Sequence, residues 1–250
     1  MLRLYFLGTG AYDYAKDMDP GRFELNRRRS SALLVDDSIL FDCGDFLMNS
    51  FSVAGKDPKK VGAVIITHTH RDHFNEKNVT ELKAAGAQIV CSQTLKGRYN
   101  CLDGARFLLH GQQATVCGYK ITALNANHFT CEGEQPLHYL IEKDGSRLFY
   151  GLDGGSLRTE TGNFLKGAGV DLAVLDGTLG DIDGDYRLFE HNNYAMVRQL
   201  ASTLKNTGAV KGGFIISHLA PSLHLPHKKT EMLYAEIGVK TAYDGMEITV

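Results

Sequence analysis

The segment VIITHTHRDHFNE, residues 64–76, places three histidines and one aspartate in six consecutive positions, directly after an apolar run. Side chains alternate along a strand, so His68 and His70 would project to the same side and could bind one metal ion together. Asp72 and His73 fall in the turn before an expected helix, offset enough to serve a second ion. Because a zinc site in a protein takes about four ligands, two ions need more than this segment supplies. The chain must therefore fold so that other segments bring ligands to the end of this strand.

Other strand-like runs also end in histidine or aspartate. They are ILFDCGD, ITALNANHF, LFYGLDGG, LAVLDGT and FIISHLA. A single such residue would more often bond a turn amide, but buried strands that repeatedly end in a polar residue at one edge can assemble a site there. We expect the missing ligands to be His128, Asp153 and His218, with Asp176 as a weaker candidate. A carboxylate is the natural group to bridge two cations, since each of its oxygens can bind one ion.

The rest of the pattern predicts many short strands and a few helices. Hairpins are expected around Asp36–Asp37 and around Asp144–Gly145, a preferred two-residue turn. Helical periodicity predicts helices within 75–87, 191–208 and 227–238. Their apolar faces would be Val79, Leu82 and Ala85, then Met196, Leu200 and Leu204, and finally Met232, Tyr234 and Ile237. Two sheets covered by helices, in a single domain over residues 1–250, accommodate these elements.

Composition limits the classes of function. The 250-residue chain has a net charge of −2, which disfavours a dedicated nucleic-acid binder. Its basic run, Arg27–Arg29, is expected to be a solvated loop before a strand. Five cysteines without a CxxC spacing fit an intracellular protein with free thiols, and no segment is long enough to span a membrane. We therefore expect a cytoplasmic protein with no membrane partner.

The order of these residues resembles the metallo-β-lactamase superfamily. The similarity rests on THTHRDH at 67–73, then His128, Asp153 and His218, and also on LGTG near the start and ILFDCG before the cluster. The resemblance covers nearly the whole chain. It implies an α/β protein, α+β in some schemes, with a four-layer αββα sandwich and a dinuclear metal site on one edge.

The same resemblance divides the ligands between two divalent ions. His68, His70 and His128 would hold one ion, Asp72, His73 and His218 the other, and Asp153 would bridge them, while Asp42 would be structural. We expect zinc or manganese, although His and Asp ligation also accepts iron or nickel. Two ions about 3.5–4 Å apart can share an activated hydroxide and stabilise charge that develops on a phosphoryl or carbonyl oxygen. The implied reaction is hydrolysis, with a metal-bridging hydroxide as the nucleophile.

Further histidines bear on the substrate. His191 lies before an expected helix and resembles the histidine that protonates the leaving oxygen in phosphodiester-cleaving branches, so Asp72 and His191 are the expected catalytic residues. The positive end of that helix would lower the pKa of His191. A capping or surface position is the alternative for this residue. His224 and His227 follow His218 and could hold a substrate phosphate or carboxylate, or could simply open the last helix.

Within the superfamily, the sequence resembles small phosphodiesterases of the PhnP type, which open ribose cyclic phosphates. We expect a small-molecule phosphodiester substrate, cyclic ones included. The chain lacks the cysteine-rich extra zinc site of that enzyme, and residues 10–31 stand in its place.

Three alternatives are kept open. A 3′ tRNA-processing endonuclease would need a basic, flexible arm to grasp tRNA, and no such insertion is visible; the mild acidity also disfavours phosphate-backbone binding. A lactone or thioester hydrolase would not need His191. The third alternative, from a different class, is a non-catalytic metal-binding accessory protein of cofactor biosynthesis. A homodimer is also kept open.

Overall fold

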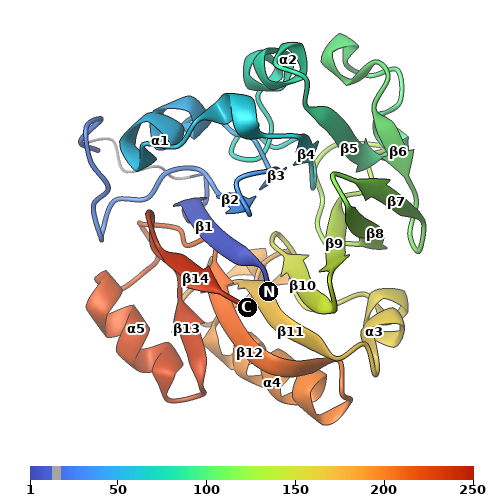
Figure 1. Cartoon of the computed structure of the whole chain (residues 1–250). Coiled ribbons are helices and arrows are strands. Elements are labelled where there is room, and N and C mark those ends of the chain that lie inside the picture. The colour runs from blue at the N-terminus through green and yellow to red at the C-terminus, as the bar shows by residue number, and fades with distance from the viewer. Residues whose placement is uncertain (13–17) are drawn as a thin grey trace.

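Two stacked sheets form the centre of the protein. The computed structural model describes residues 1–12 and 18–250, and in this part of the chain fourteen strands form two seven-stranded sheets. Their strand orders are β14-β1-β2-β3-β4-β5-β6 and β13-β12-β11-β10-β9-β8-β7. Helices α1 and α2 cover the outer face of the first sheet, and α3, α4 and α5 cover that of the second (Figure 1). The four-layer αββα sandwich expected from the sequence is confirmed.

The elements have the following bounds. The first sheet contains β1 (Arg3–Gly8), β2 (Ala32–Val35), β3 (Ile39–Phe41), β4 (Ala63–Ile65), β5 (Gln88–Ser92), β6 (Arg106–Leu108) and β14 (Glu247–Thr249). The second contains β7 (Gln113–Val116), β8 (Tyr119–Asn125), β9 (Leu137–Lys143), β10 (Ser146–Gly151), β11 (Val170–Asp176), β12 (Val210–Ser217) and β13 (Val239–Thr241). The helices are α1 (Leu47–Ala54), α2 (Glu76–Ala84), α3 (Thr159–Leu165), α4 (Tyr194–Asn206) and α5 (His227–Ala235). Four short 3-10 helices are η1 (Pro58–Lys60), η2 (Gln93–Leu95), η3 (Asn100–Leu102) and η4 (Tyr186–Phe189).

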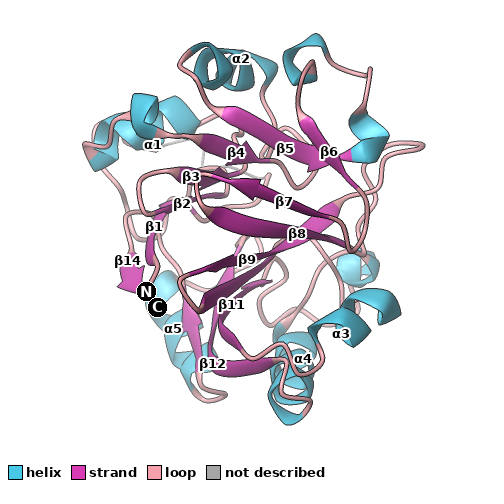
Figure 2. Ribbon diagram, turned by 45° about the vertical axis from the view of Figure 1, so that its right-hand side comes forward, coloured by secondary structure: helices cyan, strands magenta, loops and turns pink. Residues whose placement is uncertain are grey.

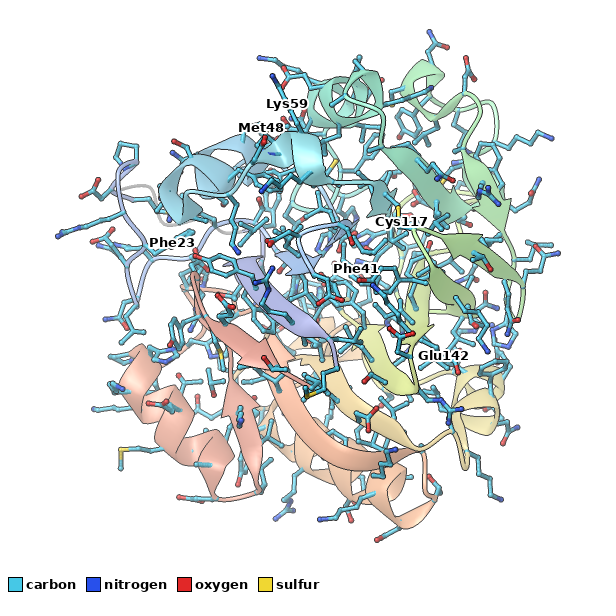
Figure 3. All side chains as sticks on the ribbon, viewed as in Figure 1. Phe23, Phe41, Met48, Lys59, Cys117 and Glu142 are labelled. Atoms are coloured by element: carbon cyan, nitrogen blue, oxygen red, sulfur yellow. The ribbon has the colours of Figure 1, made fainter. Side chains whose placement is uncertain are left out.

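The inner strands are buried on both faces because each sheet lies between a helical layer and the other sheet (Figure 2). On β4, Ala63 and Ile65 join the core between the sheets, whereas Val64 packs toward α1 and α2. Phe41 of β3 lies near the middle of the molecule (Figure 3). Its ring stacks on that of Tyr150 of β10, with ring centroids 4.4 Å apart. Aromatic packing thus joins the two sheets directly.

Both predicted hairpins are present. Strands β2 and β3 are antiparallel around Asp36 and Asp37, which have φ of 48° and 56°. Strands β9 and β10 are joined by Asp144 and Gly145, with φ of 49° and 81°. Left-handed φ at two successive turn residues gives a twist that matches the twist of the flanking strands.

The three predicted helices are found as α2, α4 and α5, but their faces differ in part from the expected ones. The buried side chains of α4 are Val197, Ala201 and Leu204, so the face is rotated from the one expected. On α5, Met232 is 71% exposed. Helices α1 and α3 are not predicted, because LMNSFSVA and TETGNFL are short and rich in weak helix formers. Within the described residues, every helix is too short or too polar to cross a bilayer.

The expectation of a solvated basic loop is wrong for Arg28 and Arg29, which are buried. The Arg28 guanidinium donates to Thr9 Oγ1 (2.6 Å) and to the Ala242 carbonyl (2.8 Å). Asp244 accepts hydrogen bonds from the amides of Arg29 (2.7 Å) and Thr9 (2.9 Å). A buried charge is tolerated when it is paired and hydrogen-bonded, and the partners here come from the end of the chain. This cluster ties the segment before β2 to the turn before β14.

The β9–β10 turn offers a test of these backbone arguments. Gly145→Ala should lower the free energy of unfolding by about 1 kcal/mol, because an L-residue is strained at positive φ. The matched control is Gly162→Ala within α3, where a Cβ would meet no atom within 4 Å. That change should raise stability by up to about 1 kcal/mol, since alanine favours the helix. Urea unfolding of both variants measures the two effects, and equal signs would contradict the assigned turn.

Candidate metal centre

The predicted site residues follow the carboxyl ends of strands in both sheets. Asp42 follows β3, His68 follows β4, His128 follows β8, Asp153 follows β10 and His218 follows β12. Strands β3 and β4 are parallel, as are β10, β11 and β12, so their carboxyl ends share an edge. The expectation that polar strand ends meet on one rim is confirmed.

The side chains on this rim form two clusters that share one carboxylate. The first contains His68, His70, His128 and Asp153, and the second Asp72, His73, His218 and Asp153; within each cluster, one donor atom per residue lies within 4.8 Å of the others. Asp153 Oδ2 lies 3.0 Å from both His68 Nε2 and His73 Nε2. Its other oxygen, Oδ1, lies 2.8 Å from His218 Nδ1. The grouping is the one that the resemblance implies, with Asp153 between the two halves.

Several polar atoms in the clusters point to a missing partner. Among the described residues, His68 Nε2, His73 Nε2, His128 Nδ1 and Asp153 Oδ1 are buried without a well-aligned hydrogen bond, although all but His128 Nδ1 lie within 3.0 Å of a carboxylate or imidazole partner. A buried polar group without a good hydrogen bond costs up to about 1–3 kcal/mol, so a shared ligand for these four converging atoms would be favourable. Imidazole nitrogens and carboxylate oxygens are suitable donors for divalent metal ions. The residues therefore fit a dinuclear metal site, whose metal identity the donor set leaves open.

A shell of hydrogen bonds orients the histidines that come from the first sheet. The Thr67 hydroxyl donates to Asp42 Oδ1 (2.8 Å) and lies 2.9 Å from His68 Nδ1. Asp42 Oδ2 lies 2.8 Å from His73 Nδ1 and accepts a hydrogen bond from the Tyr150 hydroxyl (3.2 Å). With Nδ1 engaged, Nε2 of each ring is directed into the clusters. The structural role expected for Asp42 matches these contacts, whereas Thr67 and Tyr150 are not predicted from the sequence.

A second shell lies behind the residues from the other sheet. The Thr178 hydroxyl lies 2.7 Å from His218 Nδ1 and donates to Asp176 Oδ2 (2.8 Å). Asp176 Oδ2 lies 2.9 Å from His191 Nδ1, and Oδ1 accepts from the Asn192 amide (2.9 Å). Asp176 is near enough to the clusters to be grouped with metal ligands. Because its oxygens are already occupied, we interpret it as the anchor of His191 instead.

The backbone is strained where it delivers these residues. Asp42, Asp153 and His218 have φ of 60°, 54° and 59°. A non-glycine residue in this region costs on the order of 1–3 kcal/mol and persists where its surroundings hold it, often at functional sites. Gly44 permits a further close approach, because a Cβ at this position would lie 2.1 Å from the carbonyl oxygen of Asp72.

Burial and mutual charge shift the pKa values of the clustered groups in opposite directions. Burial disfavours the protonated form of His73 and His218, but the surrounding carboxylates, Asp153 foremost, together outweigh it and hold both pKa values well above 6.5. Burial disfavours the carboxylate of Asp153, but the two imidazolium charges keep its pKa well below its ordinary value. Burial lowers the pKa of His68, and it lowers that of His128 to about 4. Without metal, protonated His73 and His218 would therefore offset part of the negative charge of the surrounding carboxylates.

His191 has the opposite pKa shift from the one expected. Burial lowers its pKa, as the helix end would, but the charge and hydrogen bond of Asp176, 2.9 Å away, together with the charge of Asp153, outweigh this and raise the pKa above 6.5. The expectation is wrong because this long-range carboxylate partner is not evident from the segment around His191.

A cavity of about 670 Å³ opens over the clusters. His70, Asp72, His128, Asp153, His191 and His218 are among its lining residues, and its walls include Tyr12, Arg71, Tyr186, Arg187, Phe189 and Glu190. Its volume lies within the range of about 300–1,000 Å³ that is typical of small-molecule sites.

The structure does not bring His224 and His227 to this cavity. His224 Nε2 donates to the Gly177 carbonyl (2.8 Å), and His227 Nδ1 lies 2.9 Å from a guanidinium nitrogen of Arg28. Both residues line a separate hollow of about 550 Å³. His227 is the first residue of α5. The structure therefore favours the alternative in which these histidines support the last helix and its preceding loop.

Comparisons with known proteins agree with this geometry. A family model described as "Beta-lactamase superfamily domain" matches residues 37–211. Ribonuclease Z of Pediococcus pentosaceus is 36% identical over 76 residues, a match that spans 29% of this chain and only 22% of that protein.

Two solved structures have the same fold. The metallo-β-lactamase fold protein YhfI from Bacillus subtilis has a TM-score of 0.75 and 18% identity, with all of both chains covered. Zinc-bound PqqB from Methylobacterium extorquens has a TM-score of 0.75 and 13% identity, with 99% of this chain and 100% of that chain covered.

The shared carboxylate should control metal content. Asp153→Ala should lose both ions, because the carboxylate belongs to both clusters, whereas Asp103→Ala, in an exposed loop, should retain them. Elemental analysis after dialysis, with circular dichroism to verify folding, measures the difference. A folded Asp153→Ala protein that retains both ions would contradict the site.

Metal binding at pH 7 should release protons. His73 and His218 are protonated in the metal-free protein because their pKa values lie well above 6.5, whereas a ligand nitrogen must be neutral. Metal affinity should therefore rise with pH through the neutral range and level off above the raised pKa values. Calorimetric zinc titrations in two buffers of different ionisation enthalpy should give different heats. Equal heats would contradict a protonated pair.

Proposed function

The chain belongs to the metallo-β-lactamase superfamily, and on that premise we propose that it is a phosphodiesterase that hydrolyses a small phosphodiester. The broader assignment, a metal-dependent hydrolase, rests on the family and on the two buried His/Asp clusters. The choice of a phosphodiester is the proposal, and it rests on the cavity residues.

The observation that carries the proposal is the position of His191. Its ring lines the cavity, with its centroid 5.1 Å from that of His128 and 5.5 Å from that of His218. Asp176 holds its Nδ1 and favours the protonated ring. An imidazolium fixed beside the clusters is suited to donate a proton to the leaving oxygen of a diester. A lactone or thioester hydrolase has no comparable need for this group.

The other side chains have roles that follow from their places. His68, His70 and His128 would hold one ion, Asp72, His73 and His218 the other, and Asp153 both. The chemistry that two bound divalent ions supply is activation of water and stabilisation of charge on a phosphoryl oxygen. Asp72 also lines the cavity, where its carboxylate can orient the attacking water. We propose zinc or manganese, and the zinc found in the similar protein PqqB supports zinc.

An RNA hydrolase is the second candidate. The similarity to Ribonuclease Z favours it, although that match spans 22% of the relative. The net charge of −2 opposes it, because binding a long phosphate backbone depends on many lysines and arginines. Parallel assays with a tRNA precursor and with small diesters, each with zinc or manganese, distinguish the two candidates.

Loss of His191 should slow chemistry without removing metal. His191→Ala should reduce kcat about 100- to 10,000-fold for diesters with alkoxide leaving groups, and much less for bis(p-nitrophenyl) phosphate, whose leaving group needs little protonation. His110→Ala, outside the cavity lining, is the matched control and should leave both rates unchanged. Equal slowing of good and poor leaving groups would refute the role as acid. No hydrolysis of any diester by the fully metal-loaded protein would favour a non-catalytic accessory protein.

A further inference from the structure

Two aromatic side chains stand almost fully exposed in the wall of the metal cavity. Tyr186 and Phe189, the first and last residues of η4, are 79% and 81% exposed and line the cavity. Burying a ring of this size is worth about 1.5–3 kcal/mol, so exposed rings beside a site are well placed to contact a ligand. Tyr12, 62% exposed, adds a third ring from the segment after β1.

The turn that carries these rings is held against the metal clusters. The Asp185 side chain caps η4 through the Arg187 amide (2.9 Å), and the His191 amide donates to the Arg187 carbonyl (2.8 Å). The Asn127 amide group, next to His128, donates to the Phe189 carbonyl (3.4 Å).

A glycine lets the same turn approach closely. A Cβ on Gly155 would lie 2.8 Å from the Leu188 carbonyl oxygen. Gly155 lies two residues after Asp153, and Phe189 lies two residues before His191. The backbone that carries the rings is therefore held close to both the shared carboxylate and the proposed proton donor.

The charged side chains of the cavity wall are less suited to bind a substrate than the exposed aromatic rings are. The two arginines of the wall both have carboxylate partners, Arg71 with Asp45 and Arg187 with Asp185. Glu190 adds a negative charge to the same wall, with 41% of its side chain exposed. The part of the substrate that does not react would therefore contact flat apolar rings, beside arginines whose charges are already paired with carboxylates.

We propose that the substrate is a nucleotide-sized phosphodiester whose base stacks on Phe189 and Tyr186 while its phosphate lies over the metal clusters. This inference rests on the proposed phosphodiesterase function and adds the class of substrate. Bases stack on aromatic side chains whatever their sequence, because every base has a π-face. The cavity volume of about 670 Å³ suits one or two nucleotides, not a long strand. In the reaction, a water oxygen forms the new bond to phosphorus, one ester P–O bond breaks, and the leaving oxygen takes a proton from His191; the proton that the water loses passes to solvent, from which His191 is protonated again.

A matched pair of substrates tests the base. Adenosine 2′,3′-cyclic phosphate and the 2,3-cyclic phosphate of methyl riboside share the reacting group and differ only in the base. The wild-type protein should hydrolyse the adenosine compound with a kcat/KM about 10-fold or more higher. Phe189→Ala and Tyr186→Ala should each shrink this preference by about 5-fold or more, through the KM of the adenosine compound. Phe164→Ala on α3, 38% exposed and outside the cavity lining, should keep the full preference.

Binding gives a readout that does not depend on turnover. Calorimetry on the metal-loaded protein should show that adenosine 5′-monophosphate binds about 10-fold or more tightly than ribose 5-phosphate, and Phe189→Ala should abolish the difference. If no diester is hydrolysed but this difference holds, the phosphodiesterase proposal fails and the base site stands. If diesters are hydrolysed with no preference for a base, or the ring variants slow both substrates equally, the base site is overturned alone. A single-stranded oligonucleotide hydrolysed more than 10-fold better than the cyclic nucleotide would overturn the nucleotide-sized limit.

Discussion

The carboxylate of Asp153 is the contact on which the rest of the site depends. It lies 3.0 Å from a nitrogen of His68 and of His73, and 2.8 Å from one of His218. These partners come from both sheets, so one buried negative charge organises side chains that are distant in sequence. The same charge is the foremost of the carboxylate charges that raise the pKa values of His73 and His218. A left-handed φ of 54° at Asp153 shows that the backbone adopts a strained conformation to place it.

Around this centre, the structure separates groups that would bind metal from groups that hold them. Asp42 and Thr67 fix the histidines of the first sheet, while Asp176 and Thr178 fix His191 and His218. A carboxylate within reach of the clusters is therefore not automatically a ligand. The hydrogen bonds that such a carboxylate already makes decide whether it can bind a metal. Both oxygens of Asp176 are engaged in hydrogen bonds, so neither is available as a ligand.

Much of the fold and of the candidate site could be predicted from the sequence because the relevant information is local. The spacing of THTHRDH, the polar strand ends and the Asp144–Gly145 turn each lie within a few residues, and the structure has them as expected. The errors involve partners far along the chain. Arg29 is buried against Asp244, 215 residues away, and the charge state of His191 depends on Asp176. Local periodicity also misjudges the faces of α4 and α5, because neighbouring elements decide which side is covered.

The stacked pair Phe41 and Tyr150 links the interior of the sandwich to the metal centre. Phe41 lies on one sheet and Tyr150 on the other, and the Tyr150 hydroxyl donates to Asp42, which in turn contacts His73. A small displacement of one sheet relative to the other would therefore be transmitted, through these three contacts, to His73 in the second cluster. Core residues that never approach an ion thus help set how tightly ions are held, and adaptation of the core to temperature would be expected to retune metal affinity at the same time.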